Sequence, residues 1–192
     1  MRNLSPTQID IYKNDSNNVL LILTGLGGTT TGYQNKYVTI AKQATQKGWS
    51  VIVAATPNGA SLAENEPEYF NALLEQVYQV MENKDLTIYA MGHSQGANIL
   101  LWYAYLHPQI KRILSINPVL DWNTHLLSNG VKKFTGERIN VICGEKDGSA
   151  YYSPMLPQTP KTHITQLPNV DHNFTGQLDL FIDLPNQFLF NE

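Results

Sequence analysis

A serine in a glycine-flanked turn is the residue of this chain best placed to do chemistry. Ser94 stands at the centre of Gly92-His93-Ser94-Gln95-Gly96, after an apolar run over 86–91 and before a helix-like run over 97–106. A sharp turn between a strand and a helix holds its serine in a strained backbone conformation with the hydroxyl exposed. Glycines are needed there because Cβ atoms would collide. A serine hydroxyl is a weak nucleophile, so a chemical role also requires an adjacent base.

The segments around this turn alternate between strand-like and helix-like patterns. Apolar or alternating runs predict strands at 9–12, 19–23, 49–55, 86–91, 111–117, 138–143 and 162–167. Helical spacing predicts helices at 33–47, 68–83, 95–106 and 178–190, the last broken at Pro185, with a partly helical segment at 118–134 and a proline-rich loop at 149–161. Strands that alternate with helices predict an α/β fold, a mostly parallel sheet with helices on both faces. We expect a single domain over residues 1–192.

Three polar residues follow predicted strands. Ser94 comes after the strand at 86–91, Asp147 after that at 138–143, and His172 after that at 162–167. Because parallel strands end at one edge of a sheet, all three are expected at the edge where ligand sites of such sheets lie. The pentapeptide around Ser94 resembles the nucleophile elbow of the α/β-hydrolase superfamily, whose catalytic residues follow the chain order Ser, Asp or Glu, His. The resemblance extends from about Val19 to the end of the chain, and implies a three-layer α/β-hydrolase sandwich.

The resemblance implies roles for these residues. Ser94 would be the nucleophile, His172 the base that takes its proton, and Asp147 the acid that orients the imidazole. Two backbone N–H groups would form an oxyanion hole, those of Gln95 and of Leu26 in the turn Thr24-Gly25-Leu26-Gly27-Gly28. That turn often begins with histidine in the resembling enzymes. Thr24 departs from the pattern, which leaves open what supports the loop.

Each assignment has an alternative. Asp121, after the strand at 111–117, is a rival acid, although the Gly144-Glu145-Lys146-Asp147 ending resembles the usual acid loop and favours Asp147. Asp147 could instead be a turn residue before a glycine, and His172 a surface histidine. His93 is expected to be structural. The Gly-rich segment 25–28 could suggest phosphate binding, but it lacks the Gly-Lys-Ser/Thr of a P-loop.

The segment between the fifth and sixth principal strands bears on the substrate. It spans only the 20 residues 118–137, which is too short for a cap domain. Its Trp122, Leu126 and Leu127 could wall an apolar pocket, together with Tyr33, or could simply pack on the sheet. An open, uncapped site suits a small or accessible ester better than a long buried acyl chain.

Composition excludes other classes of protein. A net charge of −3 without a Lys/Arg cluster argues against a nucleic-acid surface, and no apolar run is long enough to span a membrane. The first 18 residues are polar and lack the apolar core of a secretion signal, which favours a cytoplasmic protein. His, Asp and Glu do not cluster at metal-ligand intervals, so we expect no metal and no cofactor. The sequence gives no indication of oligomeric state.

These observations together predict a serine hydrolase that acts on a small-molecule carboxylic ester through an acyl-enzyme intermediate. A thioesterase, or an amidase or peptidase, would use the same three residues. A non-catalytic binding protein on the same fold is the alternative of another class. The complete set of nucleophile, base and acid argues against it.

Overall fold

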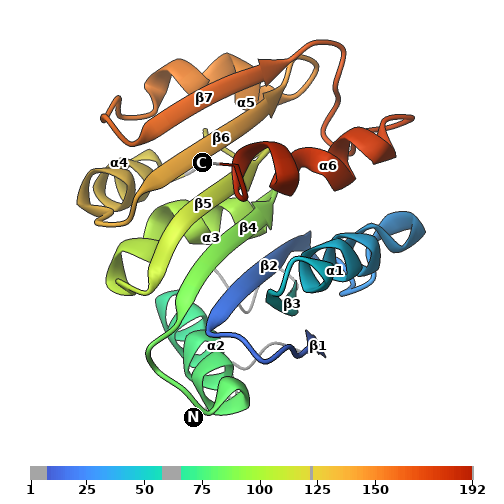
Figure 1. Cartoon of the computed structure of the whole chain (residues 1–192). Helices are drawn as coiled ribbons and strands as arrows, with labels where there is room; N and C mark the ends of the chain where they lie inside the picture. The colour runs from blue at the N-terminus through green and yellow to red at the C-terminus, as the bar shows by residue number, and fades with distance from the viewer. Residues whose placement is uncertain (1–7, 58–65, 122, 192) are drawn as a thin grey trace.

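The computed structural model describes residues 8–57, 66–121 and 123–191, which form a seven-stranded sheet between two helical layers (Figure 1). The strands are β1 (Ile9–Tyr12), β2 (Asn18–Leu26), β3 (Ser50–Thr56), β4 (Thr87–His93), β5 (Ile110–Ile116), β6 (Arg138–Gly144) and β7 (Thr162–Leu167). Their order across the sheet is β1-β3-β2-β4-β5-β6-β7. Only β1 pairs antiparallel, with β3. The predicted α/β class and mostly parallel sheet are confirmed.

Strand β2 lies between β3 and β4 and shows how the core is divided. Its residues 19–23 are all 0% exposed, as expected of an unbroken apolar run with a helical layer on either side. Successive side chains point to opposite faces. Val19, Leu21 and Leu23 therefore pack in one core, and Leu20 and Ile22 in the other.

The helices cover the sheet in two groups. α1 (Lys36–Gln46) and α6 (Leu178–Phe188) pack together on the face that is toward the viewer in Figure 1. α2 (Glu66–Met81), α3 (Gln95–Tyr103), α4 (Thr124–Lys133) and the short α5 (Gly148–Tyr152) lie on the other face. Three short 3₁₀ helices, η1 (Tyr33–Asn35), η3 (Ala104–Leu106) and η4 (Ser153–Met155), adjoin α1, α3 and α5.

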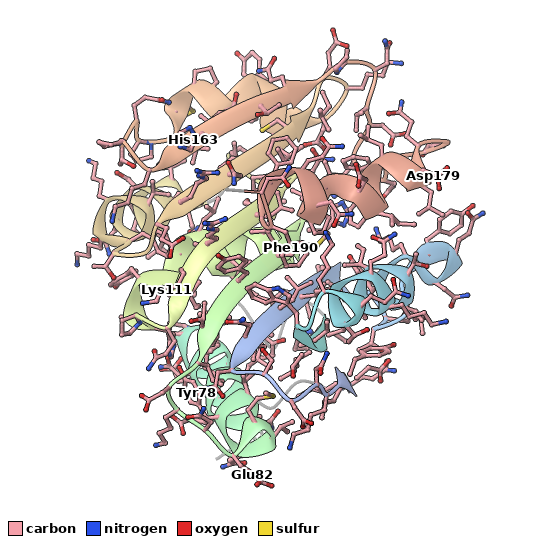
Figure 2. All side chains as sticks on the ribbon, in the orientation of Figure 1. Tyr78, Glu82, Lys111, His163, Asp179 and Phe190 are labelled. Carbon is pink, nitrogen blue, oxygen red and sulfur yellow. The ribbon has the colours of Figure 1, made fainter. Side chains whose placement is uncertain are left out.

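Aromatic side chains close the α1 and α6 face at the end away from Ser94. The ring of Trp49 lies 4.4 Å from that of Tyr89 and 5.2 Å from that of Phe190, centroid to centroid. Figure 2 labels Phe190, which lies in front of the sheet beside the end of α6. Arg112 donates hydrogen bonds to the carbonyls of Leu189 and Asn191, at 2.9 Å each. The segment after α6 is thereby held against β5.

Two local expectations were wrong. The segment expected to be a loop at 149–161 begins with α5 and η4, because Asp147 caps α5 and Pro154 occupies a first-turn position where proline is tolerated. Helix α6 also continues through Pro185. Proline lacks a backbone N–H, so Pro185 costs the helix one hydrogen bond. Only three residues of α6 follow Pro185, so the rest of the helix keeps its own bonds.

The connection between β5 and β6 holds α4, which packs on α3. Over the described part of that connection the chain forms no separate cap domain, as its length predicts. Trp122, one of the expected pocket residues, lies outside the described residues. None of the helices in the described ranges is long and apolar enough to cross a membrane.

Candidate active site

Ser94 occupies a strained turn between β4 and α3. Its backbone has φ 56° and ψ −121°, a conformation that non-glycine residues rarely adopt. A Cβ atom at Gly96 would lie 2.4 Å from the Thr24 carbonyl oxygen, and one at Gly92 would lie 2.5 Å from the Gly96 carbonyl oxygen. The two glycines are therefore needed for strand and helix to pass this closely. The Ser94 N–H donates to the Ile116 carbonyl on β5 at 2.9 Å, which fixes the turn to the sheet.

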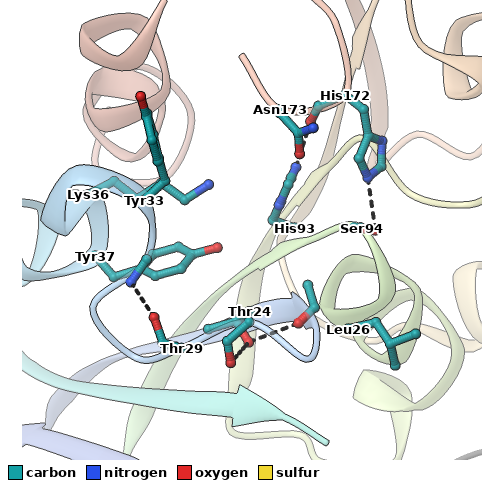
Figure 3. A pocket seen from close by; sticks show the side chains of 13 residues that line it. Thr24, Leu26, Thr29, Tyr33, Lys36, Tyr37, His93, Ser94, His172 and Asn173 are labelled. Carbon is teal, nitrogen blue, oxygen red and sulfur yellow. Dashed lines mark hydrogen bonds between the residues drawn. The ribbon is translucent and has the colours of Figure 1, made fainter. Parts of the chain in front are cut away.

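The structure brings Ser94, His172 and Asp147 into one hydrogen-bonded chain. His172 Nε2 lies 3.0 Å from Ser94 Oγ, and His172 Nδ1 lies 2.6 Å from Asp147 Oδ2. Figure 3 shows the imidazole of His172 directed at Ser94. Since Asp147 accepts from Nδ1–H, Nε2 is free to accept the serine proton. The side chain of His172 is 39% exposed and that of Asp147 is 10% exposed, so the imidazole is far more accessible to solvent than the carboxylate.

Asp147 is held at the start of α5. Its Oδ1 accepts a hydrogen bond from the Ser149 N–H at 2.8 Å, and its own N–H donates to the Gly144 carbonyl at 2.9 Å. Burial acts to raise the pKa of this carboxyl, but the hydrogen bonds from His172 and Ser149 outweigh burial and lower it. The carboxylate is therefore ionised at neutral pH. Asp121, the rival acid, is exposed, and the hydrogen-bond partner of His172 Nδ1 is Asp147.

Asn117 is a supporting residue that sequence reasoning missed. It follows β5 with φ 45°, and its Nδ2 donates to the carbonyls of Asp171 and His172 at 3.1 Å each. Its Oδ1 accepts from the Gly144 N–H at 2.7 Å. One amide therefore ties the loop that carries His172 to the strand that precedes Asp147. The sequence signal for it was weak, a polar residue at the very end of the strand predicted at 111–117.

His93 supports the same loop from the other side. Its Nε2 lies 2.8 Å from the His172 carbonyl oxygen, so the ring donates Nε2–H. Burial, together with the positive charge of Lys36, lowers the pKa of His93 to about 3. The ring is therefore neutral at physiological pH and acts as a structural donor, in line with the prediction that His93 is structural.

Thr24 supplies the support that the sequence left open for the Leu26 loop. It is 0% exposed, its Oγ1 accepts from the Thr56 N–H at 2.9 Å, and the same hydroxyl donates to the Gly25 carbonyl at 3.1 Å. Thr56 Oγ1 donates back to the Thr24 carbonyl at 2.7 Å. These bonds fix the loop to the end of β3. Leu26 follows with a 52% exposed side chain, and Gln95 is the first residue of α3.

Two cavities open on either side of His172. The first, of about 340 Å³, contains Ser94, Leu26 and Tyr33, whose side chain is 72% exposed. The second, of about 260 Å³, is lined by Leu120, Asp121, Tyr152 and Asp147.

The other expected pocket residues lie elsewhere. Leu127 is 3% exposed and belongs to the core, and beside the second cavity it lines a small apolar space with Leu120 and Tyr152. Leu126 packs against the same core. Across the described ranges, no three His, Cys, Asp or Glu side chains are grouped as metal ligands.

Comparisons with known proteins agree with this architecture. Among solved structures, Est1E from Butyrivibrio proteoclasticus superposes with a TM-score of 0.68 at 15% identity, covering 93% of this chain and 90% of its own. Dienelactone hydrolase from Anabaena variabilis gives a TM-score of 0.69 at 14% identity, covering 94% and 91%. An alpha-beta serine hydrolase homologue from Coxiella burnetii gives 0.63 at 17%, covering 92% and 88%. At these identities the likeness is one of fold.

The sequence itself carries the family assignment. No curated protein shows significant sequence similarity to the chain. The family model described as the alpha/beta hydrolase fold matches residues 18–135, which is more than half of the sequence and includes the turn at Ser94. The chain belongs to the alpha/beta hydrolase family.

Proposed function

We propose that this protein is a serine hydrolase that cleaves a small or accessible carboxylic ester through an acyl-enzyme intermediate. The observation that carries the proposal is the hydrogen-bonded chain from Ser94 Oγ through His172 to Asp147, at 3.0 and 2.6 Å. A binding protein has no need of a serine held in a strained turn within reach of a carboxylate-paired histidine.

The first half of the reaction forms the acyl-enzyme. Ser94 Oγ attacks the ester carbonyl carbon while its proton passes to His172 Nε2. The tetrahedral intermediate collapses as His172 gives that proton to the departing alkoxide oxygen, and the acyl group stays on Ser94. In the second half a water molecule attacks the carbonyl carbon of the acyl-enzyme while its proton passes to His172 Nε2. The second tetrahedral intermediate collapses as His172 gives that proton to Ser94 Oγ, which releases the carboxylic acid. Asp147 remains ionised throughout and stabilises the imidazolium.

The oxyanion of each tetrahedral intermediate needs preorganised donors. We assign this role to the backbone N–H groups of Gln95 and Leu26. Gln95 lies directly after the nucleophile at the start of α3, where the helix dipole also favours negative charge. The Leu26 loop passes close to the nucleophile, since a Cβ atom at Gly25 would lie 3.4 Å from Ser94 Cβ.

Covalent labelling tests the nucleophile. An alkyl fluorophosphonate is expected to add one phosphonyl group to the wild-type protein and none to Ser94→Ala, by intact mass. Peptide mapping would place the group on Ser94. Folded wild-type protein that stays unlabelled would contradict the enzyme assignment and favour the binding-protein alternative.

A matched substrate panel tests the bond that is cleaved. 4-Nitrophenyl butyrate, a butyryl thioester and a butyryl 4-nitroanilide share the acyl group and differ in the leaving atom. We expect kcat/KM to be highest for the ester and lowest for the anilide, whose nitrogen requires stronger protonation to leave. A preference for the thioester or the anilide would replace the esterase with the corresponding alternative.

A further inference from the structure

Lys36 is an unusual residue for the wall of a cavity that contains Ser94. It is the first residue of α1, it is only 8% exposed, and it lines the first cavity with Ser94, His93 and His172. Figure 3 shows its ammonium group and the hydroxyl of Tyr37 extending from α1 toward the side of the cavity where His93 and Ser94 lie. A cation is therefore held near the nucleophile rather than in solvent.

Within the part of the chain that the structure describes, the ammonium group of Lys36 has no anionic partner. Its Nζ lies 3.8 Å from the centroid of the Phe181 ring and 5.0 Å from that of Tyr37, which are cation–π contacts. Among residues 8–57, 66–121 and 123–191, no carboxylate, carbonyl or hydroxyl accepts a hydrogen bond from it. An ammonium group carries three N–H donors, and ring faces satisfy them only weakly. Burial lowers the pKa of Lys36 to about 8, so the group is still mainly protonated at neutral pH.

The two cavities beside His172 differ in charge. Of the residues that line the first cavity, Lys36 brings a positive charge and none brings a carboxylate. The second cavity is lined by Asp121 and Asp147. An anionic group of a bound ester would be attracted to the first cavity and repelled from the second. The positive end of the α1 dipole, with no acidic residue in the first turn, acts in the same direction.

We propose that Lys36 binds a carboxylate carried by the substrate, so that the protein selects esters with a carboxylate a few bonds from the scissile carbonyl. This inference rests on the proposed ester hydrolysis and names its substrate class. The carboxylate would accept hydrogen bonds from Lys36 Nζ and from the Tyr37 hydroxyl, while Ser94 attacks the ester carbonyl.

Two pairs of esters test this selectivity. Ethyl hydrogen succinate and ethyl pentanoate differ in charge on the acyl side. 4-Acetoxybenzoate and 4-methylphenyl acetate differ in charge on the alcohol side. For each pair the readout is the ratio of kcat/KM for the charged ester to that for the neutral ester, which cancels effects on folding and on the triad.

Substitutions at Lys36 and at a control lysine distinguish a specific role of Lys36 from the general effect of removing one positive charge. In Lys36→Met and Lys36→Gln we expect the ratio for at least one pair to fall by roughly 10- to 100-fold, the range of one hydrogen bond to a charged group. Lys36→Arg should keep most of the ratio. Lys42→Met removes the same charge from an exposed position on α1 and should leave the ratio unchanged. Ratios that stay the same in both neutral variants for both pairs would overturn the proposal.

A binding measurement distinguishes this inference from the proposed function. Pentanoate should perturb the NMR signals of cavity residues in the wild-type protein and in Ser94→Ala, and much less in Lys36→Met. Turnover of neutral esters without any effect of Lys36 would refute the carboxylate site and leave the esterase intact. Carboxylate binding that needs Lys36, in a protein that hydrolyses no ester and resists fluorophosphonate, would refute the esterase alone.

Discussion

The buried, neutral His93 should make the protein sensitive to acid in a defined pH window. The pKa of this histidine falls from an ordinary 6.5 to about 3 in the folded protein, because burial and then the charge of Lys36 oppose protonation. Below pH 6.5 the unfolded chain binds a proton here that the folded protein does not. Stability therefore decreases as the pH falls from 6.5 toward 3.

The size of the effect follows from the two pKa values. One pKa unit corresponds to about 1.4 kcal/mol, so this group alone lowers the free energy of unfolding by about 2 kcal/mol at pH 5 relative to pH 7.5. The loss reaches about 4 kcal/mol at pH 3. Even the smaller figure is a large fraction of the stability of a typical domain.

The comparison requires a variant that keeps the hydrogen bond and lacks the titration. His93→Gln replaces the ring with an amide whose N–H can still donate to the His172 carbonyl. Urea unfolding followed by tryptophan fluorescence, at pH 7.5 and 5.0, gives the free energy of unfolding of each protein. We expect the wild type to lose about 2 kcal/mol more than His93→Gln between these pH values.

Other acid-sensitive groups largely cancel when the pH-dependent loss of stability is compared between the wild type and His93→Gln. The lowered pKa of Asp147 also contributes stability that is lost as pH falls, but both proteins share that carboxylate. Equal losses in the wild type and His93→Gln would show that His93 is protonated in the folded protein. That result would refute our account of a desolvated, structural histidine.

Further substitutions test the site. Asp147→Asn should lower kcat by roughly 10³- to 10⁴-fold, whereas Asp121→Asn should change it by no more than about twofold, measured on one ester; the reverse would make Asp121 the acid. Thr24→Val should lower the free energy of unfolding by about 1–3 kcal/mol in urea, because the Thr56 N–H loses its acceptor, and should reduce kcat. Thr24→Ser, which keeps the hydroxyl, should preserve both. Asn117→Ala should lower kcat more than it changes KM, because it releases the loop that carries His172, and an unchanged kcat would show that Asn117 does not support that loop.

The sequence carried much of this architecture because its signals are local. Unbroken apolar runs such as 19–23 predict doubly covered strands, and the glycines around Ser94 predict a close crossing of strand and helix. Parallel strands then bring distant residues to one edge, which is why Asp147 and His172 could be proposed without coordinates. The expectations at Pro185 and at 149–161 were wrong because the helices there depend on capping by Asp147 and on the position of each proline within its turn, which apolar periodicity does not report.

The supporting residues were hidden because their roles depend on tertiary contacts. Asn117 acts through carbonyls more than 50 residues away, at positions 171 and 172. Lys36 lies on an amphipathic helix, where a lysine is ordinarily expected to face solvent. Its burial depends on the Phe181 ring of α6, which no local pattern relates to it. Thr24 stands where the resembling enzymes often have histidine, and its support of the Leu26 loop follows only from its hydrogen bonds to Thr56.

One ring on α6 links two of these features. Phe181 lies 3.8 Å from Lys36 Nζ and packs edge-on against His93 at 5.5 Å between ring centroids. It therefore keeps water from both ionisable groups, and the charge of the first also disfavours protonation of the second. Substitutions at these three positions should be non-additive, since each resets the surroundings of the other two. During evolution, a replacement of Lys36 that changed the preferred charge of the substrate would therefore also change the selection that acts on positions 93 and 181.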